Sequence, residues 1–284
     1  MRHEFNGKTA VYGVIGDPVG HSLSPQIHGY FAKLCGVNMA YVPFHVKEAG
    51  IPAAIAGAHS LGIKGLNVTV PHKKTVIPHL FEVNEMAEKV SAVNTLLWAE
   101  QGYIGHNTDY LGIERTVQSL GLNFTGRNVA IIGAGGSAYA AAIAAADGGA
   151  KHIYIINRTR ENAVVLASHI NTHYNVPIDI FSEPTTIEPE IVIQTTTVGF
   201  GGLQGMSPVS DANFFKACKL AFDIIYTPWE TVFLTQAKEY GVPNIINGFP
   251  MLVYQAMAAF GLWQENINDG EIHIKELAKR LYAN

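Results

Sequence analysis

The chain has 284 residues, of which 48% are hydrophobic and only 15% are charged. Disordered chains combine low hydrophobicity with high net charge, and this chain, at a net charge of −4, shows neither feature, which excludes that class. With 19 basic and 23 acidic residues there is no basic footprint, so we expect no nucleic-acid partner. Because charges are so few, each one among apolar residues needs a reason.

The cysteine content and the N-terminus indicate a cellular setting. Cys35 and Cys218 are far apart and show no CxxC spacing, so they predict small buried thiols in a reducing compartment rather than disulfides or a zinc site. The first six residues lack the apolar region of a secretory signal. The charge-free run 129–146 is rich in glycine and alanine and predicts a buried strand and helix, not a membrane span. We therefore expect a soluble cytoplasmic protein, monomeric or homodimeric, that binds no membrane.

The first hundred residues alternate short apolar runs with glycine and proline breaks. Strands are predicted at 11–15, 41–44 and 66–70. A helix is predicted to start at Ser24-Pro25, because serine can cap a helix, proline suits its first turn, and apolar residues follow at helical spacing. Strands alternating with helices predict an α/β layered domain.

A second pattern starts near residue 128, where the predicted strands are continuously apolar. Such strands, separated by helices, are typical of a parallel sheet buried on both faces. A linking helix is predicted between 108 and 127, and two helices, 251–263 and 274–282, end the chain. We therefore predict two domains, with the C-terminal helices returning to the first. The strands of the second domain are predicted at 129–132, 152–157, 178–181, 191–194, 220–225 and 244–246.

The segment after the first of these strands fits the pattern G-x-G-x-x-G/A and opens a helix. In that pattern the glycines permit a tight turn and let the backbone approach a pyrophosphate at the helix N-terminus. A plain strand–helix turn is the simpler alternative, but strand, helix and next strand follow at the spacing that a dinucleotide site requires. The predicted cofactor-binding residues of this loop are Gly133, Ala134, Gly135, Gly136, Ser137 and Ala138.

The end of the second strand of this domain indicates which dinucleotide binds. An NAD site usually places Asp or Glu here to hold the ribose 2′-hydroxyl, whereas this chain has Asn157, Arg158, Thr159 and Arg160. Arginine can pair with a 2′-phosphate through charge-assisted hydrogen bonds, although surface arginines at a helix start are the alternative interpretation. The pattern favours NADP and leaves NAD possible.

Polar residues gather at element ends in the first domain. Ser22 and Ser24 stand at a predicted helix N-terminus, which can hold a carboxylate, and capping needs only one serine. Asn67 and Thr69 lie two apart on one predicted strand, with Lys73 within reach of its end. Singly, such residues have structural explanations. Together with Asn94 and Asp109, the latter most simply a helix cap, they suit a small polyhydroxylated carboxylate.

These motifs resemble those of the shikimate dehydrogenase family, in the family's order and over nearly the whole chain. The resemblance implies an α/β substrate domain at 1–108, completed by 249–284, and a Rossmann-like doubly wound dinucleotide-binding domain at 109–248. It implies reversible NADPH-dependent reduction of 3-dehydroshikimate to shikimate, a step of aromatic amino acid biosynthesis, without a metal. The matching segments are 16–25, 67–73, 92–95, 107–109, 133–138, 157–159 and 248–255.

The resemblance also implies roles for particular residues. Lys73 and Asp109 would form the catalytic pair, because hydride arriving at a ketone leaves an alkoxide that an ammonium group can protonate while the carboxylate orients the lysine. Ser22 and Ser24 would hold the substrate carboxylate, with Tyr226 nearby. The residues expected to bond the substrate hydroxyls are Asn67, Thr69, Asn94 and Gln255, and the further cofactor-binding residues are Asn157, Arg158, Thr159, Gly248 and Met251.

The chain departs from the family pattern at four places. His28 precedes Gly29 instead of Asn, Tyr139 replaces an arginine, the loop 196–200 is bulkier than usual, and Tyr110 follows the catalytic Asp in place of Gly. These departures leave open an enzyme that uses NAD with quinate or a related cyclohexane acid, and a catalytically silent ligand-binding protein. The intact catalytic pair argues against the silent protein, since binding alone needs neither residue.

Two further features of the sequence are compatible with other roles. His169 and His173 lie four apart on a predicted helix and could bind zinc from one face, but no third ligand or HExxH motif accompanies them, so no metal is predicted. Gln255 lies in an apolar helix, where its amide needs partners. Core hydrogen bonding and substrate contact are both possible there, and the resemblance favours substrate contact.

Overall fold

The computed structural model describes residues 5–184, 187–264 and 267–282. Residues 1–4, which begin the segment considered for a secretory signal, lie outside the described ranges. The chain divides into two compact units, one formed by residues 1–112 with 253–284 and the other by residues 113–252.

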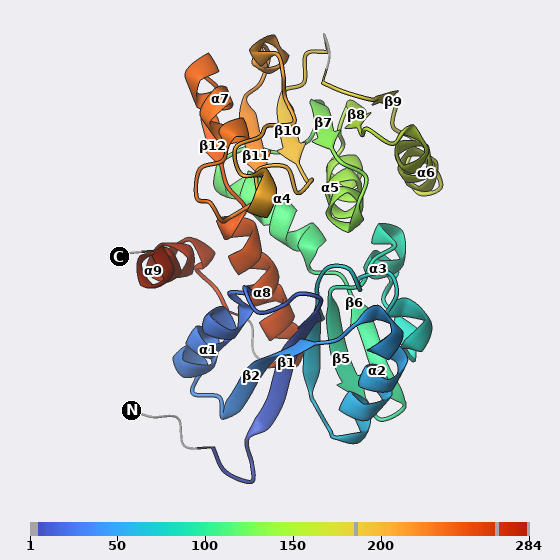
Figure 1. The fold of residues 1–284 in the computed structure, drawn as a ribbon, viewed down its shortest axis with the longest axis vertical. Helices are drawn as coiled ribbons and strands as arrows, with labels where there is room; N and C mark the ends of the chain where they lie inside the picture. The colour runs from blue at the N-terminus through green and yellow to red at the C-terminus, as the bar shows by residue number, and fades with distance from the viewer. Residues whose placement is uncertain (1–4, 185–186, 265–266, 283–284) are drawn as a thin grey trace. The chain divides into compact units, whose positions relative to one another are not determined.

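The sheet of the first unit has the strand order β2-β1-β3-β5-β6-β4 (Figure 1). Its first three strands in that order are parallel, and β5 runs antiparallel to both neighbours. The three strands predicted here are confirmed, although the third ends at Val68 rather than at residue 70, and the hairpin of β5 and β6 was not predicted. The strands are β1 (Ala10–Gly16), β2 (Met39–His45), β3 (Gly65–Val68), β4 (Glu82–Val83), β5 (Thr95–Ala99) and β6 (Gly102–His106).

The first helix begins at Ser24 as predicted, but Ser24 does not cap it, because no side-chain capping bond is formed at this helix start. Instead, the Ser22 hydroxyl accepts from the Ser24 N–H at 3.2 Å. The N-cap position falls on Leu23, one residue earlier than the proline alone indicates, so Ser24 is already the first helical residue and its side chain cannot cap the helix. The helices of this unit and its borders are α1 (Ser24–Cys35), α2 (Ile51–Ser60), α3 (Glu85–Val90), α4 (Asp109–Ser119), α8 (Phe249–Trp263) and α9 (Gly270–Tyr282).

The end of α8 is fixed on this sheet by Trp263. A Cβ at Gly65 of β3 would lie 2.3 Å from Trp263 Nε1, so glycine is required for the indole to lie against the strand. The indole N–H donates to the Leu96 carbonyl at 3.0 Å, and the ring lies 5.2 Å from that of Tyr12. This anchor holds the end of α8, the helix that carries Gln255, on the first sheet.

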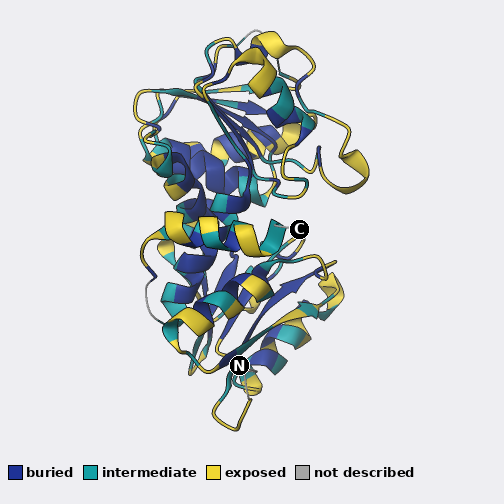
Figure 2. Ribbon diagram, turned by 90° about the vertical axis from the view of Figure 1, so that its left-hand side faces the viewer, coloured by how far each residue is buried: buried dark blue, intermediate teal, exposed yellow. Residues whose placement is uncertain are grey.

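The second unit contains a fully parallel sheet in the order β12-β11-β10-β7-β8-β9. This order is that of the Rossmann fold, so the predicted fold class is confirmed. Its four inner strands are mostly buried, as the dark blue arrows in Figure 2 show, whereas the edge strands β9 and β12 are only half-buried. The elements are β7 (Asn128–Ile132), β8 (His152–Ile156), β9 (Ile178–Phe181), β10 (Ile191–Gln194), β11 (Leu220–Asp223), β12 (Asn244–Ile246), α5 (Gly136–Asp147), α6 (Arg160–Asn171) and α7 (Val232–Tyr240).

The run 129–146 forms β7 and α5, as predicted. Within the described ranges, no helix has the length and apolar character needed to cross a membrane. Cys218 is buried, and burial raises the pKa of its thiol to about 12. Cys35 is only half-buried, so the prediction of a buried thiol was wrong there, because the last residue of α1 faces partly outward.

Candidate active site

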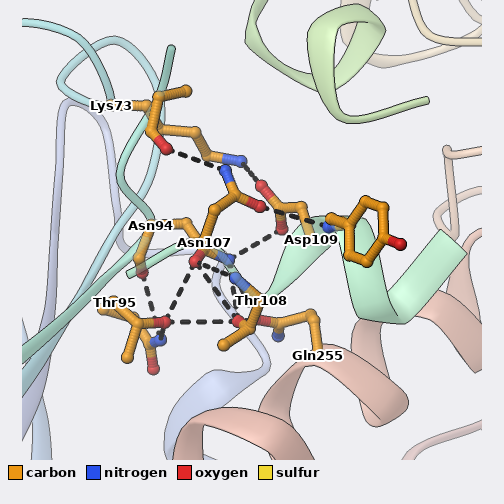
Figure 3. Close-up of polar contacts among 10 residues, drawn as sticks. Lys73, Asn94, Thr95, Asn107, Thr108, Asp109 and Gln255 are labelled. Carbon is orange, nitrogen blue, oxygen red and sulfur yellow. Dashed lines mark hydrogen bonds and ion pairs between the residues drawn. The ribbon is translucent and has the colours of Figure 1, made fainter. Parts of the chain in front are cut away.

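Lys73 and Asp109 form a largely buried ion pair in the first unit (Figure 3). Lys73 Nζ lies 2.5 Å from Asp109 Oδ2, and the two side chains are 16% and 8% exposed. Lys73 follows β3, and Asp109 is the first residue of α4. The other carboxylate oxygen accepts from Asn94 Nδ2 at 2.9 Å. Since both oxygens of Asp109 are bonded, the carboxylate holds the ammonium group in a defined place.

Asp109 is not the cap of α4, so that simpler interpretation was wrong. Asn107 takes this role, because its Oδ1 accepts from the Tyr110 N–H at 3.1 Å. The Asn107 amide also donates to the Ala92 carbonyl at 2.9 Å, which ties the start of α4 to the segment before β5. The Asp109 carboxylate is therefore available for the lysine.

Asn94 is the centre of the polar cluster and is 3% exposed. Its Oδ1 accepts from the Thr108 N–H at 2.8 Å, and its Nδ2 donates to Asp109 and, at 3.0 Å, to Thr108 Oγ1. Gln255 Oε1 on α8 lies 3.4 Å from the same Nδ2 and 3.4 Å from Thr108 Oγ1. Protein groups therefore satisfy both ends of the Asn94 amide.

Asn67 is also committed within the protein. Its Nδ2 donates to the Asn94 carbonyl at 3.2 Å and to Thr95 Oγ1 at 3.1 Å, and its Oδ1 accepts from the Tyr41 hydroxyl at 2.7 Å. Burial raises the pKa of the Tyr41 phenol well above 10, while a hydrogen bond with Ser24 acts in the opposite direction. Tyr41 therefore connects Ser24 to the amide cluster.

His28 lies next to Tyr41 and is fully buried. Its ring stacks on Tyr41 with centroids 4.4 Å apart and planes inclined by 6°. Burial lowers the pKa of His28 to about 3, and the nearby Asn67 side chain acts in the opposite direction. Neither ring nitrogen makes a hydrogen bond of ordinary geometry to a described residue, so the imidazole stays neutral at physiological pH.

The other predicted substrate-binding residues lie in several places. Ser22 is half-buried ahead of α1, Thr69 is half-buried directly after β3, and Ser24 is buried. Tyr226 is half-buried after β11, in the second unit. The structure thus brings Ser24, Asn67, Asn94 and Gln255 into contact with the catalytic pair or its hydrogen-bond network.

Three residues of this cluster were given no site role of their own from the sequence: Tyr41, Thr95 and Thr108. Both threonines stand beside residues that the motifs singled out, Asn94 and Asp109. Their role depends on the pairing of β3 with β5, which aligns Asn67 with Thr95. Sequence reasoning could have found this role only by predicting strand β5.

The glycine-rich loop of the second unit joins β7 to α5. Gly133 has φ of +121°, and a Cβ there would lie 2.4 Å from Thr195 Oγ1, so the fold itself requires glycine. Gly135 differs, because its backbone is extended (φ −86°, ψ −174°) and a Cβ would meet nothing within 4 Å. No side chain caps α5. An anion could approach the start of α5, because there is space at Gly135 and no side chain caps the helix. Ala138 is fully buried, as close helix–strand packing requires.

The residues after β8 present a positive charge. Arg158 is exposed and has no ion-pair partner among the described residues, while Asn157 Nδ2 donates to the Thr159 carbonyl at 2.7 Å. Arg160 Nη1 lies 3.4 Å from the Ile180 carbonyl. Arg158 is therefore positioned to receive an anionic group.

The remaining predicted positions have structural roles of their own. A Cβ at Gly248 would lie 1.9 Å from the Ile224 carbonyl oxygen, so glycine is needed there for backbone packing, and Met251 is buried.

Tyr139 is buried, with its ring 5.4 Å from that of His169. His169 and His173 have ring centroids 5.2 Å apart, and the described residues contain no group of three potential metal ligands.

A buried carboxylate at the end of β11 was not singled out from the sequence. Asp223 is fully buried and accepts from the Thr231 hydroxyl at 2.6 Å and the Ile225 N–H at 3.0 Å. Gln194 lies 3.4 Å away and holds the loop after β10 through bonds to Thr196 and Val198. Burial raises the pKa of Asp223 from 3.8 to about 6.

This raised pKa predicts a pH-dependent loss of stability. Between pH 4 and 6 the folded carboxyl keeps a proton that the unfolded one releases, so the free energy of unfolding falls as pH rises. We expect Asp223→Asn to gain about 2 kcal/mol relative to the wild type between pH 4 and 7. Urea unfolding of both proteins at several pH values measures the difference. A constant difference would show that Asp223 does not titrate in this range.

Comparison with known proteins agrees with this geometry. Residues 14–96 match the model of the shikimate dehydrogenase substrate binding domain, and residues 115–198 match that of shikimate / quinate 5-dehydrogenase. The chain is 41% identical over 264 residues to shikimate dehydrogenase (NADP(+)) of Caldanaerobacter subterraneus, covering 92% of this chain and 93% of that protein.

Solved structures show the same fold. A shikimate dehydrogenase in complex with NADP+ is 33% identical, with a TM-score of 0.87 and 98% coverage of both chains. Shikimate 5-dehydrogenase from Listeria monocytogenes, in complex with shikimate and NAD, is 29% identical, with a TM-score of 0.88 and coverage of 96% of this chain and 97% of that one. With the Lys–Asp pair, the amide cluster and the glycine-rich loop in place, the chain belongs to the shikimate dehydrogenase family.

Proposed function

We propose that this protein catalyses the reversible NADP-dependent oxidation of shikimate to 3-dehydroshikimate. The observation that carries the proposal is the buried ion pair of Lys73 and Asp109, set among amides and hydroxyls. A lysine beside a reacting hydroxyl can accept or return its proton, and the carboxylate holds that lysine in place. The relatives named as NADP-dependent shikimate dehydrogenases support the same activity.

The substrate has one carboxylate and several hydroxyls, and the site offers groups for each. Ser22 and Ser24, at the start of α1, would hold the carboxylate, aided by the positive end of the helix dipole. Asn67, Thr69 and Gln255 would bond the hydroxyls. Asn94 would touch the substrate only by exchanging one of its protein partners, so its main task is to hold Asp109. Tyr226 would contribute near the carboxylate.

The residues of the second unit fit a dinucleotide. The loop from Gly133 to Ala138 would hold the pyrophosphate, because the position of Gly135 leaves room for it and the start of α5 is uncapped. Arg158 would pair with the 2′-phosphate, with Asn157 and Thr159 shaping that corner. Gly248 and Met251 would also line the dinucleotide-binding site. Bound NADP supplies the nicotinamide that takes up or releases hydride.

The two glycines of the loop allow a direct test of this cofactor site. We expect Gly135→Val to weaken NADP binding at least about tenfold while leaving the unfolding midpoint unchanged, because the side chain would enter space that only a ligand needs. Gly133→Val should instead lower the unfolding midpoint, since its φ and its contact with Thr195 exclude a side chain. Nucleotide titration by fluorescence and thermal unfolding measure both variants. Normal NADP affinity in Gly135→Val would remove the loop from the site.

The activity itself is tested by mixing the protein with NADP or NAD and with shikimate or quinate, and following the absorbance of reduced nicotinamide. We expect shikimate with NADP to be the fastest pair. Faster turnover of quinate with NAD would establish the paralogous activity instead. The reason to test it is Tyr139, which is buried at a position where the family usually has arginine. No turnover with any pair would contradict the proposal. We further propose a cytoplasmic location, consistent with the free thiols of Cys35 and Cys218.

A further inference from the structure

We propose that Thr95 is a positioning residue that joins two amide side chains of the site into one directed chain of hydrogen bonds, from Tyr41 to the Asp109 carboxylate. The inference rests on the proposed function for its catalytic consequence. Thr95 is fully buried, so it can act on a substrate only through its neighbours (Figure 3).

The direction of the chain is determined at its Asp109 end. A backbone N–H can only donate, and that of Thr108 lies 2.8 Å from Asn94 Oδ1. The carboxylate paired with Lys73 accepts, and it lies 2.9 Å from Asn94 Nδ2. These two partners leave one orientation for the Asn94 amide.

The orientation of Asn67 is determined in the same way. The Asn94 carbonyl can only accept, and it faces Asn67 Nδ2 at 3.2 Å. Asn67 Oδ1 therefore faces the Tyr41 hydroxyl, which must donate across 2.7 Å. The Tyr41 ring is held in turn by its stacking on the buried His28.

Thr95 connects the two amides. Its Oγ1 receives the second N–H of Asn67 at 3.1 Å, so its own proton is free to point to Asn94 Oδ1 at 3.0 Å. Thr108 Oγ1, at 3.2 Å from Thr95 Oγ1, belongs to the same cluster. Each donor along the path thus points toward Asp109, and bonds aligned in this way strengthen one another.

This arrangement has a consequence for substrate choice. Both N–H groups of Asn67 are used inside the protein, so Asn67 can offer a ligand only an acceptor. It would bind a hydroxyl, which donates, and not a carbonyl, which only accepts. Loss of the Thr95 hydroxyl would leave one Asn67 N–H without its partner. It would also remove the hydrogen bond to Asn94 Oδ1 and so weaken the positioning of Asn94 and Asp109.

Matched variants test this role. Thr95→Val keeps the branched shape and removes the hydroxyl, whereas Thr95→Ser keeps the hydroxyl. We expect Thr95→Val to lower kcat/KM for shikimate roughly 10- to 100-fold, as for an unsatisfied buried hydrogen bond, with the KM for NADP unchanged. Thr95→Ser should stay within about threefold of the wild type. Equal losses in both variants would indicate packing alone, and normal activity of Thr95→Val would overturn the proposal.

A second measurement does not depend on activity. In ¹⁵N-labelled protein without substrate, the side-chain amide protons of Asn67 and Asn94 should exchange slowly in the wild type and in Thr95→Ser, and faster in Thr95→Val. Unchanged exchange in Thr95→Val would contradict the chain even if the wild type turned over no acid. An inactive wild type with the expected exchange pattern would instead contradict only the proposed function. Thermal unfolding of each variant identifies any general loss of structure.

Discussion

Replacement of Lys73 by alanine is expected to lower kcat for shikimate oxidation by roughly 10²–10⁴-fold, the range for a positioned acid–base group. The reason is the geometry of the pair, in which Asp109 Oδ2 holds the ammonium nitrogen at 2.5 Å within a largely buried cluster. No other lysine among the described residues forms an ion pair with Asp109. Steady-state kinetics in both directions, with NADP held at saturation, measure the loss.

The adjacent lysine provides the control. Lys74 is exposed, and Asp109 pairs with Lys73 rather than with Lys74, so Lys74→Ala should retain activity within about threefold of the wild type. Asp109→Asn keeps the shape of the side chain but removes its charge. It should lose activity in the same range as Lys73→Ala because Lys73 then has no carboxylate to position its ammonium group. A Lys73→Ala variant with less than a tenfold loss would remove Lys73 from the mechanism.

Acidification from pH 7 to 4.5 is expected to destabilise the wild type by about 3 kcal/mol more than the His28→Phe variant. The unfolded histidine takes up a proton near pH 6.5, while the folded one resists until about pH 3 because it is fully buried. Between these values the unfolded state binds more protons, so the free energy of unfolding falls as pH falls. Phenylalanine preserves a ring against Tyr41 and removes the titrating group.

Urea unfolding of the two proteins at pH 7, 5.5 and 4.5 measures this effect. His79→Gln is the matched control, since it removes one exposed histidine and leaves the buried core intact. At pH 7 the His28→Phe variant should be at least as stable as the wild type, because it no longer buries two ring nitrogens without hydrogen bonds. Parallel pH profiles of the wild type and His28→Phe would show that His28 accepts a proton in the folded state.

The second unit was predictable because its strands carry their own signal. Ile131 and Ile132 of β7 are buried, and the inner strands of this sheet are mostly apolar because they are covered on both faces. The hairpin of β5 and β6 carries no such signal, since its strands contain Thr95, Gly102 and Gly105, and β5 owes its place to pairing with β3. Local pattern failed there because the stabilising contacts are distant in sequence.

The composition that excluded disorder and nucleic acid also indicated where the chemistry lies, because a charge-poor chain has few places for a buried lysine and carboxylate. By itself the sequence determined the α/β class, the parallel sheet and the glycine-rich loop, which depend on local pattern, whereas the pairing of Lys73 with Asp109 was implied by the family resemblance. Only the tertiary structure decided which side chains meet. The partners of Asp109, the cap at Asn107 and the path through Thr95 follow from the register of β3 and β5 and from the anchoring of α8 by Trp263. Hydrogen-bond direction depends on atoms that distant segments bring within hydrogen-bonding distance, and a linear pattern does not contain that distance.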